Sequence, residues 1–71
     1  LYKVLYMNAK QIERIIRKDG WILKSQKGSH QQFMHPSKKG KVTIAIHGKR
    51  EIPSKTLKSI FAQAGLNFKK L

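Results

Sequence analysis

Three histidines and a shortage of acidic residues limit the chemistry that this 71-residue chain can perform. Histidine is the side chain that exchanges a proton between about pH 5 and 8. The histidines are His30, His35 and His47, and the acidic residues are Glu13, Asp19 and Glu51. A two-metal nuclease needs several clustered carboxylates, and most glycosidases need a pair. Because the acids are few and scattered and cysteine is absent, we expect no metal site, no cofactor and no thiol catalysis.

Positive charge dominates the remaining polar residues. Sixteen residues are Lys or Arg, which gives a formal net charge of +13. This excess repels itself within a small domain, so it indicates a polyanionic partner such as RNA. The alternative for any single basic residue is that it only keeps a loop soluble and contacts no polyanion. The residues expected to contact RNA phosphates are Lys27, Lys38, Lys39, Lys41, Lys49, Arg50, Lys55 and Lys58.

Two amphipathic helices are predicted near the ends of the chain. The first begins at Asn8, where Gln11 completes a capping box, and ends at Gly20. The second follows Pro53 and ends at Gly65, with Leu66 in place for a Schellman contact. Their apolar stripes are Ile12, Ile15 and Ile16 in the first helix and Leu57, Ile60, Phe61 and Ala64 in the second.

Three strands are predicted between the helices, at 21–26, 30–35 and 41–47. The fold class is therefore α+β, in the order helix, three-stranded antiparallel sheet, helix. Both helices need one sheet face to bury their stripes, which leaves the other face open to a ligand. We expect one domain over 7–66 and a basic tail at 67–71. Residues 1–6 are expected to be an N-terminal extension, either a short edge strand or a segment of upstream or cloning origin.

The expected strand register gathers several polar residues on the open face. Pairing Phe33 with Ile44 sets His30 opposite His47 and leaves a short loop between the strands. Pairing Leu23 with Phe33 adds further residues to the open face, namely Lys24, Gln26 and Gln32. A shift of one residue would undo each of these placements.

This grouping suits RNA cleavage without a metal ion. The 2′-hydroxyl of RNA can attack its own phosphate if a base and an acid move the protons and a cation stabilises the phosphorane. The candidates for proton transfer on this face are His30 and His47, with Lys24 as a supporting cation, and the identity of the general acid is left open. The alternative for His30 and His47 is that they are ordinary exposed strand residues.

Other residues have simpler interpretations. His35 shares a face with Phe33, so we expect a partly buried structural histidine. Alternation sends His30 and His35 to opposite faces, which disfavours a zinc site. Trp21 and Phe33 could stack on bases, but their positions favour the core.

Several segments resemble the HicA family of toxins in the order in which they occur, and the likeness extends from Met7 to about Leu66. These segments are Gly20-Trp21, Lys27-Gly28-Ser29-His30, the strand at 41–47, Thr56-Leu57 and Gln63-Ala64-Gly65-Leu66. The tripeptide Gly28-Ser29-His30 is weak alone but fairly specific together with Ala64-Gly65-Leu66.

The resemblance implies a small ribonuclease that cleaves mRNA, with a double-stranded-RNA-binding-domain-like fold. Its catalytic residue would be His30, with Gly28 and Ser29 beside it, although both could simply form the turn. The resemblance also implies a HicB antitoxin that can cover the active histidine. The excess of positive charge predicts that this partner is acidic. No apolar run approaches the ~18 residues of a membrane span, so we expect a cytoplasmic protein without membrane contact.

Two other functions remain open. The order of elements is also that of a non-catalytic double-stranded-RNA-binding module, for which Lys55 and Lys58 would be a thin version of the Lys-rich start of the last helix. In a purely protein-binding role, the charge would serve only an acidic partner, and affinity for RNA would then not depend on salt.

Overall fold

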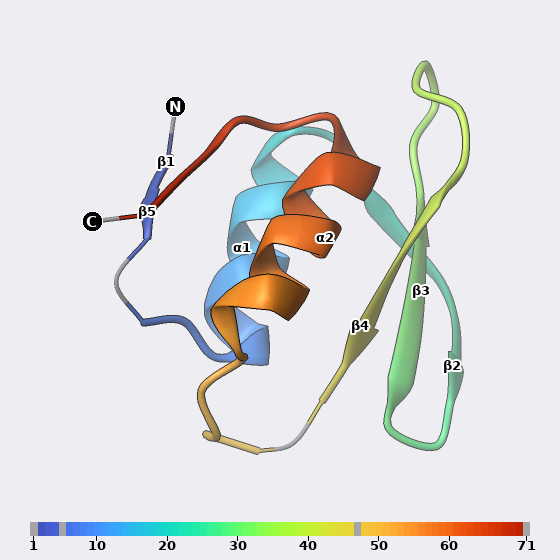
Figure 1. Ribbon diagram of the computed structural model, residues 1–71. Helices are drawn as coiled ribbons and strands as arrows, with labels where there is room; N and C mark the ends of the chain where they lie inside the picture. Colours follow the sequence, from blue (N-terminus) through green and yellow to red (C-terminus); the bar gives the residue numbers. More distant parts are fainter. Residues whose placement is uncertain (1, 5, 47, 71) are drawn as a thin grey trace.

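The computed structural model describes residues 2–4, 6–46 and 48–70. The elements are β1 (Tyr2–Val4), α1 (Ala9–Lys18), β2 (Ile22–Lys27), β3 (His30–Met34), β4 (Lys41–Ala45), α2 (Ser54–Ala64) and β5 (Phe68–Lys70). Strands β2, β3 and β4 form an antiparallel sheet with β3 in the centre, and both helices cover one face of it (Figure 1). The predicted α+β order of helix, three strands and helix is confirmed.

Local signals in the sequence set the start of α1 and the end of α2. Asn8 and Gln11 form the predicted capping box: the Asn8 side chain accepts from the Gln11 amide at 3.0 Å, and the Gln11 side chain accepts from the Asn8 amide at 2.9 Å. At the end of α2, Gly65 adopts a φ of 69°, and the Leu66 amide donates to the Phe61 carbonyl at 2.9 Å. These bonds confirm the predicted Schellman motif.

The hydrophobic core lies between the two helices and the covered sheet face. Trp21 and Phe33 are 1% and 0% exposed, which confirms that they belong to the core. The other buried apolar residues are Ala9, Ile12, Ile16, Val42, Ile44, Leu57, Ile60, Phe61 and Ala64. Core packing is the main stabilising contribution in a domain of this size, and here it also keeps the opposite sheet face free.

The predicted register between β3 and β4 is wrong by two residues. Phe33 pairs with Val42 rather than Ile44, so His30 lies opposite Ala45 and not opposite His47. The cause is His35, which leaves the strand: one ring nitrogen contacts the Asp19 carbonyl at 2.7 Å and the other accepts from the backbone of loop 36–40. A shift of two residues preserves the side-chain alternation, so His30 still lies on the open face.

A β-bulge in β2 overturns another part of the predicted register. Leu23 pairs with Phe33 as expected, but the register shifts between Leu23 and Ser25, which leaves Lys24 as the extra residue. Beyond the bulge Gln26 lies opposite Gln31, on the helix side of the sheet, instead of on the open face. Ser25 and Lys27 take the open-face positions expected for Lys24 and Gln26.

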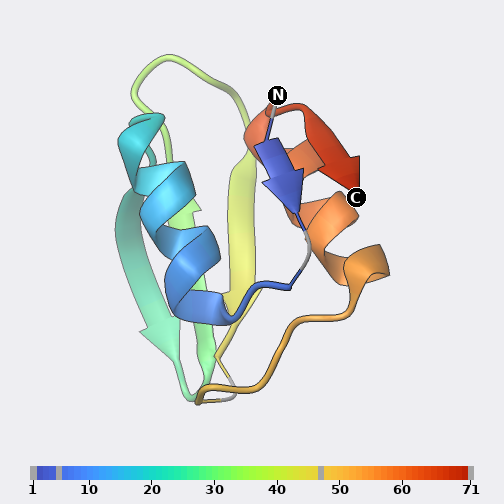
Figure 2. The same ribbon diagram turned by 90° about the vertical axis from the view of Figure 1, so that its left-hand side faces the viewer.

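A second, smaller sheet joins the two ends of the described chain. β1 and β5 are parallel neighbours and lie on the side of the helices remote from the main sheet (Figure 2). Phe68 of β5 packs edge-on against Phe61 of α2, with ring centroids 5.5 Å apart. No local sequence pattern predicts this pairing. Among the described residues, no helix is long and apolar enough to cross a membrane.

Candidate functional site

His30 begins β3 at the end of a tight hairpin turn. Gly28 and Ser29 connect the paired residues Lys27 and His30, and Gly28 has a φ of 60°. A positive φ at the first central residue alone is typical of a type II′ turn, in which glycine is favoured. The Ser29 carbonyl accepts from the Ile46 amide at 2.7 Å, which attaches the turn to the end of β4. The backbone around His30 is therefore fixed on both sides.

The imidazole of His30 is exposed and available to a ligand. Its direct cross-strand neighbours are Lys27 on β2 and Ala45 on β4, so one flank carries a cation and the other a methyl group. Within the described ranges, the ring has no hydrogen-bond or ionic partner. Both ring nitrogens can therefore face an incoming substrate.

The open face changes character along its length. The row beside His30 is followed by a polar row of Ser25, Gln32 and Thr43 and then by Ile22, Met34 and Lys41. Ile22 and Met34 are cross-strand partners that are 56% and 42% exposed, so together they form an apolar patch on this face. The face thus has a histidine end and an apolar end.

The other predicted supporting residues lie in different settings. His47 falls outside the described residues. Lys24 is exposed at the bulge and has no partner on β3. Gly28 and Ser29 act through their backbone in the turn, and the Gln26 side chain donates to the Gly28 carbonyl at 3.1 Å.

The predicted phosphate contacts divide into separate groups. The hairpin turn and the β4–α2 connection lie at one end of the main sheet, and loop 36–40 lies at the other (Figure 1). Lys27, Lys49 and Arg50 belong to the His30 end, and Lys38, Lys39 and Lys41 to the opposite end. Lys55 and Lys58 are exposed on α2. The residues at the His30 end are those that an RNA strand passing over His30 would contact first.

Lys38 has partners inside the domain. Its ammonium donates to the Asp19 carboxylate at 2.5 Å and to the Ala64 carbonyl at 3.0 Å. The Trp21 indole also donates to Asp19, at 3.2 Å. This group joins the ends of α1 and α2 to loop 36–40. Sequence reasoning missed it, and the only signal was a lone acid next to Gly20 in a very basic chain.

The contacts in this group lower the pKa of Asp19 and set the tautomer of His35. The hydrogen bond from Lys38 is the main cause that lowers the pKa of Asp19 below its ordinary value. His35 lies 4.0 Å from the Asp19 carboxylate, and its Nδ1 accepts from the amides of Ser37 and Lys38 at 3.0 and 3.1 Å. His35 is therefore a structural histidine, as predicted, and its proton belongs on Nε2 facing the Asp19 carbonyl.

Comparisons with known proteins agree with these local motifs. A family model described as the HicA toxin of bacterial toxin–antitoxin systems matches residues 9–66, from the start of α1 to just beyond α2. No curated protein matches the chain. Because the match covers most of the chain and includes the hairpin that carries His30, the protein belongs to the HicA family of bacterial toxins.

Proposed function

We propose that the protein is an endoribonuclease that cleaves mRNA without a metal ion, with His30 as the acid–base residue. Membership of a toxin family supports this proposal. So does the exposed imidazole on the open face of a strongly basic domain, which has no partner in the described part of the chain. The position of His30 beside Lys27 is the single observation that carries it, because the pair combines a proton acceptor with a phosphate-binding cation.

The proposed reaction uses the nucleophile of the RNA itself. His30 removes the proton from a 2′-hydroxyl, whose oxygen attacks the adjacent phosphorus. The bond between phosphorus and the 5′-oxygen of the next nucleotide breaks, and that oxygen leaves with a proton from a general acid. The products are a 2′,3′-cyclic phosphate and a 5′-hydroxyl. Lys27 stabilises the negative charge of the phosphorane.

A His30→Ala variant tests the catalytic assignment. Loss of an acid–base residue lowers a rate by about 100- to 10,000-fold, so cleavage of single-stranded RNA in EDTA should fall by at least about 100-fold. Gln32→Ala, one row away on the same face, is the matched control and should keep most of the activity. Equal cleavage by the parent and His30→Ala would contradict the assignment.

The alternative is a non-catalytic module that binds double-stranded RNA. The observation in its favour is the order helix, three strands, helix, with both helices on one face. Incubation of the parent with labelled single- and double-stranded RNA separates the two functions. Tight binding of an intact duplex would favour the module, whereas a 2′,3′-cyclic end on a cleaved single strand would favour the ribonuclease.

A toxin of a toxin–antitoxin system has a cognate antitoxin, and we propose that it is a HicB-like, acidic protein that covers His30. The charge of +13 and the exposed pair of Ile22 and Met34 on the same face support this proposal. Titration with the protein encoded next to this chain tests it. Met34→Glu removes apolar surface and adds a negative charge, so it should weaken the complex with an acidic antitoxin, and RNA should compete with the antitoxin for the toxin. Antitoxin binding that neither Met34→Glu nor RNA changes would place the antitoxin elsewhere.

A further inference from the structure

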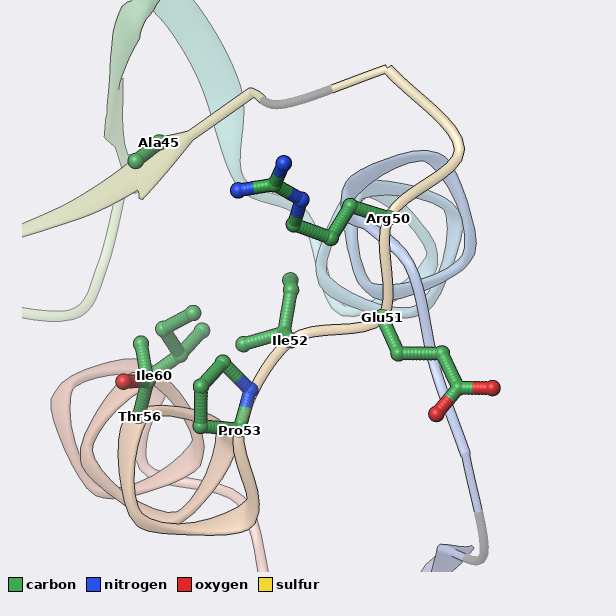
Figure 3. A pocket seen from close by; sticks show the side chains of 7 residues that line it. All are labelled: Ala45, Arg50, Glu51, Ile52, Pro53, Thr56 and Ile60. Atoms are coloured by element: carbon green, nitrogen blue, oxygen red, sulfur yellow. The ribbon is translucent and has the colours of Figure 1, made fainter.

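A cavity of about 360 Å³ lies directly beside the His30 end of the open face. It is bounded by the end of β4, the β4–α2 connection and the first turns of α2 (Figure 3). Ile52, Pro53 and Ile60 give it apolar walls, and Thr56 adds a hydroxyl. A volume of this size lies within the range of small-molecule sites, ~300–1,000 Å³, and is large enough for a planar ring.

The backbone of Ala45 provides a polar edge in this cavity. The Ile46 amide donates toward β3, to Ser29, so the N–H of the preceding residue points away from β3. The Thr43 amide confirms this direction, because it donates to Gln63 on α2 at 3.4 Å. Ala45 therefore offers its N–H and C=O on the outer side of β4, where it lines the cavity.

Charge in the cavity comes from Arg50. Its guanidinium points into the space between Ala45 and Ile52, whereas the carboxylate of Glu51 points away (Figure 3). Within the described ranges, Arg50 has no hydrogen-bond or ionic partner. The amide of Ile52 donates to the Met7 carbonyl at 2.7 Å, which fixes the backbone of this wall residue.

We infer that this cavity binds an unpaired nucleobase of the RNA, next to the phosphate at His30. A base needs apolar surfaces on its faces, hydrogen-bonding groups at its edge and a neighbouring cation, and the cavity supplies all three. His30 and Ala45 are a pair without mutual hydrogen bonds, whose Cα atoms are typically about 4.5 Å apart. This separation is shorter than one nucleotide, so a base in the cavity would place an adjacent phosphate at His30. The inference rests on the proposed ribonuclease function.

Binding to a set of short unstructured RNAs, each with one abasic nucleotide, tests the inference. His30→Ala protein is used so that the RNA remains intact. One abasic position should lower affinity about tenfold, equivalent to ~1.4 kcal/mol. Adding Arg50→Ala, or Thr56→Leu to fill the cavity, should remove this positional effect. Lys49→Ala, which removes the same charge outside the cavity, should weaken all RNAs alike and keep the positional effect.

The experiment distinguishes failure of the base pocket from failure of the proposed ribonuclease function. A flat abasic profile with salt-sensitive RNA binding would overturn the base pocket and leave the proposed function standing. A positional effect that survives both cavity variants would also overturn the pocket, as would cavity variants that change only the affinity for the antitoxin. Absence of RNA binding would overturn both proposals. Arg50 is exposed, so its variant measures the pocket even if Thr56→Leu fails to fold.

Discussion

At the scale of single residues, two histidines close in sequence have opposite roles. His30 lies on the open face and has no partner among the residues that the structure describes, whereas His35 leaves β3 and bonds to the backbone of Asp19 and loop 36–40. Alternation along a strand predicted this division. It could not predict that Lys38 would bond to Asp19 and Ala64, because these contacts join residues far apart in sequence whose meeting depends on the packing of both helices.

Replacement of Asp19 by Asn should show how much the ion pair of Asp19 with Lys38 stabilises the fold. The folded pKa of Asp19 is lowered, so its stabilisation is fully present above the unfolded value near 3.8 and is lost as the pH falls through the folded value. At neutral pH, Asp19→Asn should reduce the free energy of unfolding by about 1–3 kcal/mol, and the difference from the parent should shrink in acid. Urea unfolding at several pH values measures both effects.

Glu13→Gln is the matched control for this change. It also removes an acid from an ion pair, with Arg17 at 2.7 Å, but that pair is an exposed i,i+4 contact on α1. Such pairs contribute about 0.3–0.5 kcal/mol. Similar losses for Asp19→Asn and Glu13→Gln would show that the Asp19 group adds nothing beyond a surface pair.

At the scale of elements, the sequence predicted most of the fold because the relevant signals are local. Caps and apolar stripes placed both helices, and alternation placed three strands and their faces. The register failed where a tertiary contact intervened: His35 shortened β3 by bonding to Asp19, and the bulge at Lys24 moved Gln26 across the sheet. The cavity beside Ala45 was equally unpredictable, because it depends on how the β4–α2 connection folds over the strand end.

The junction of α1 and β2 makes a prediction at this scale. Gly20 has a φ of 108°, and a Cβ there would lie 2.8 Å from Nε2 of His35. Gly40 has a φ of 82°, and no atom of the described residues would lie within 4 Å of a Cβ there. Gly40→Ala should cost about 1–2 kcal/mol through backbone strain alone. Gly20→Ala should cost at least about 1 kcal/mol more, because the ring must move. Thermal unfolding compares them, and equal losses would refute the clash.

At the scale of the whole molecule, the basic residues differ in whether they are free to bind a partner. Lys27 flanks His30 on the open face, but the ammonium of Lys38 is already bonded within the domain. The ion pair of Lys38 with Asp19 leaves the formal net charge of +13 unchanged, but it means that one of the sixteen basic side chains is already bound within the domain. In the proposed complex, an antitoxin that covers His30 would also cover the neighbouring Lys27 and would compete there with RNA.

Salt dependence should separate these two lysines. Each phosphate contact to a single strand contributes about −0.7 to the slope of log affinity against log salt. Lys27→Ala should make the slope shallower by about this amount. Lys38→Ala should leave the slope unchanged and instead lower the free energy of unfolding. The reverse pattern would mean that Lys38 leaves Asp19 to bind RNA.

The parallel pairing of β1 with β5 has a mechanical consequence. Force applied through segments that precede β1 and follow β5 would pull two parallel neighbours in opposite directions along their shared axis. That geometry loads the backbone hydrogen bonds together in shear rather than opening them one after another. If an unfoldase pulls on one end of the chain while the other end is anchored, the pairing of β1 with β5 would have to break before the helices or β3 unfold.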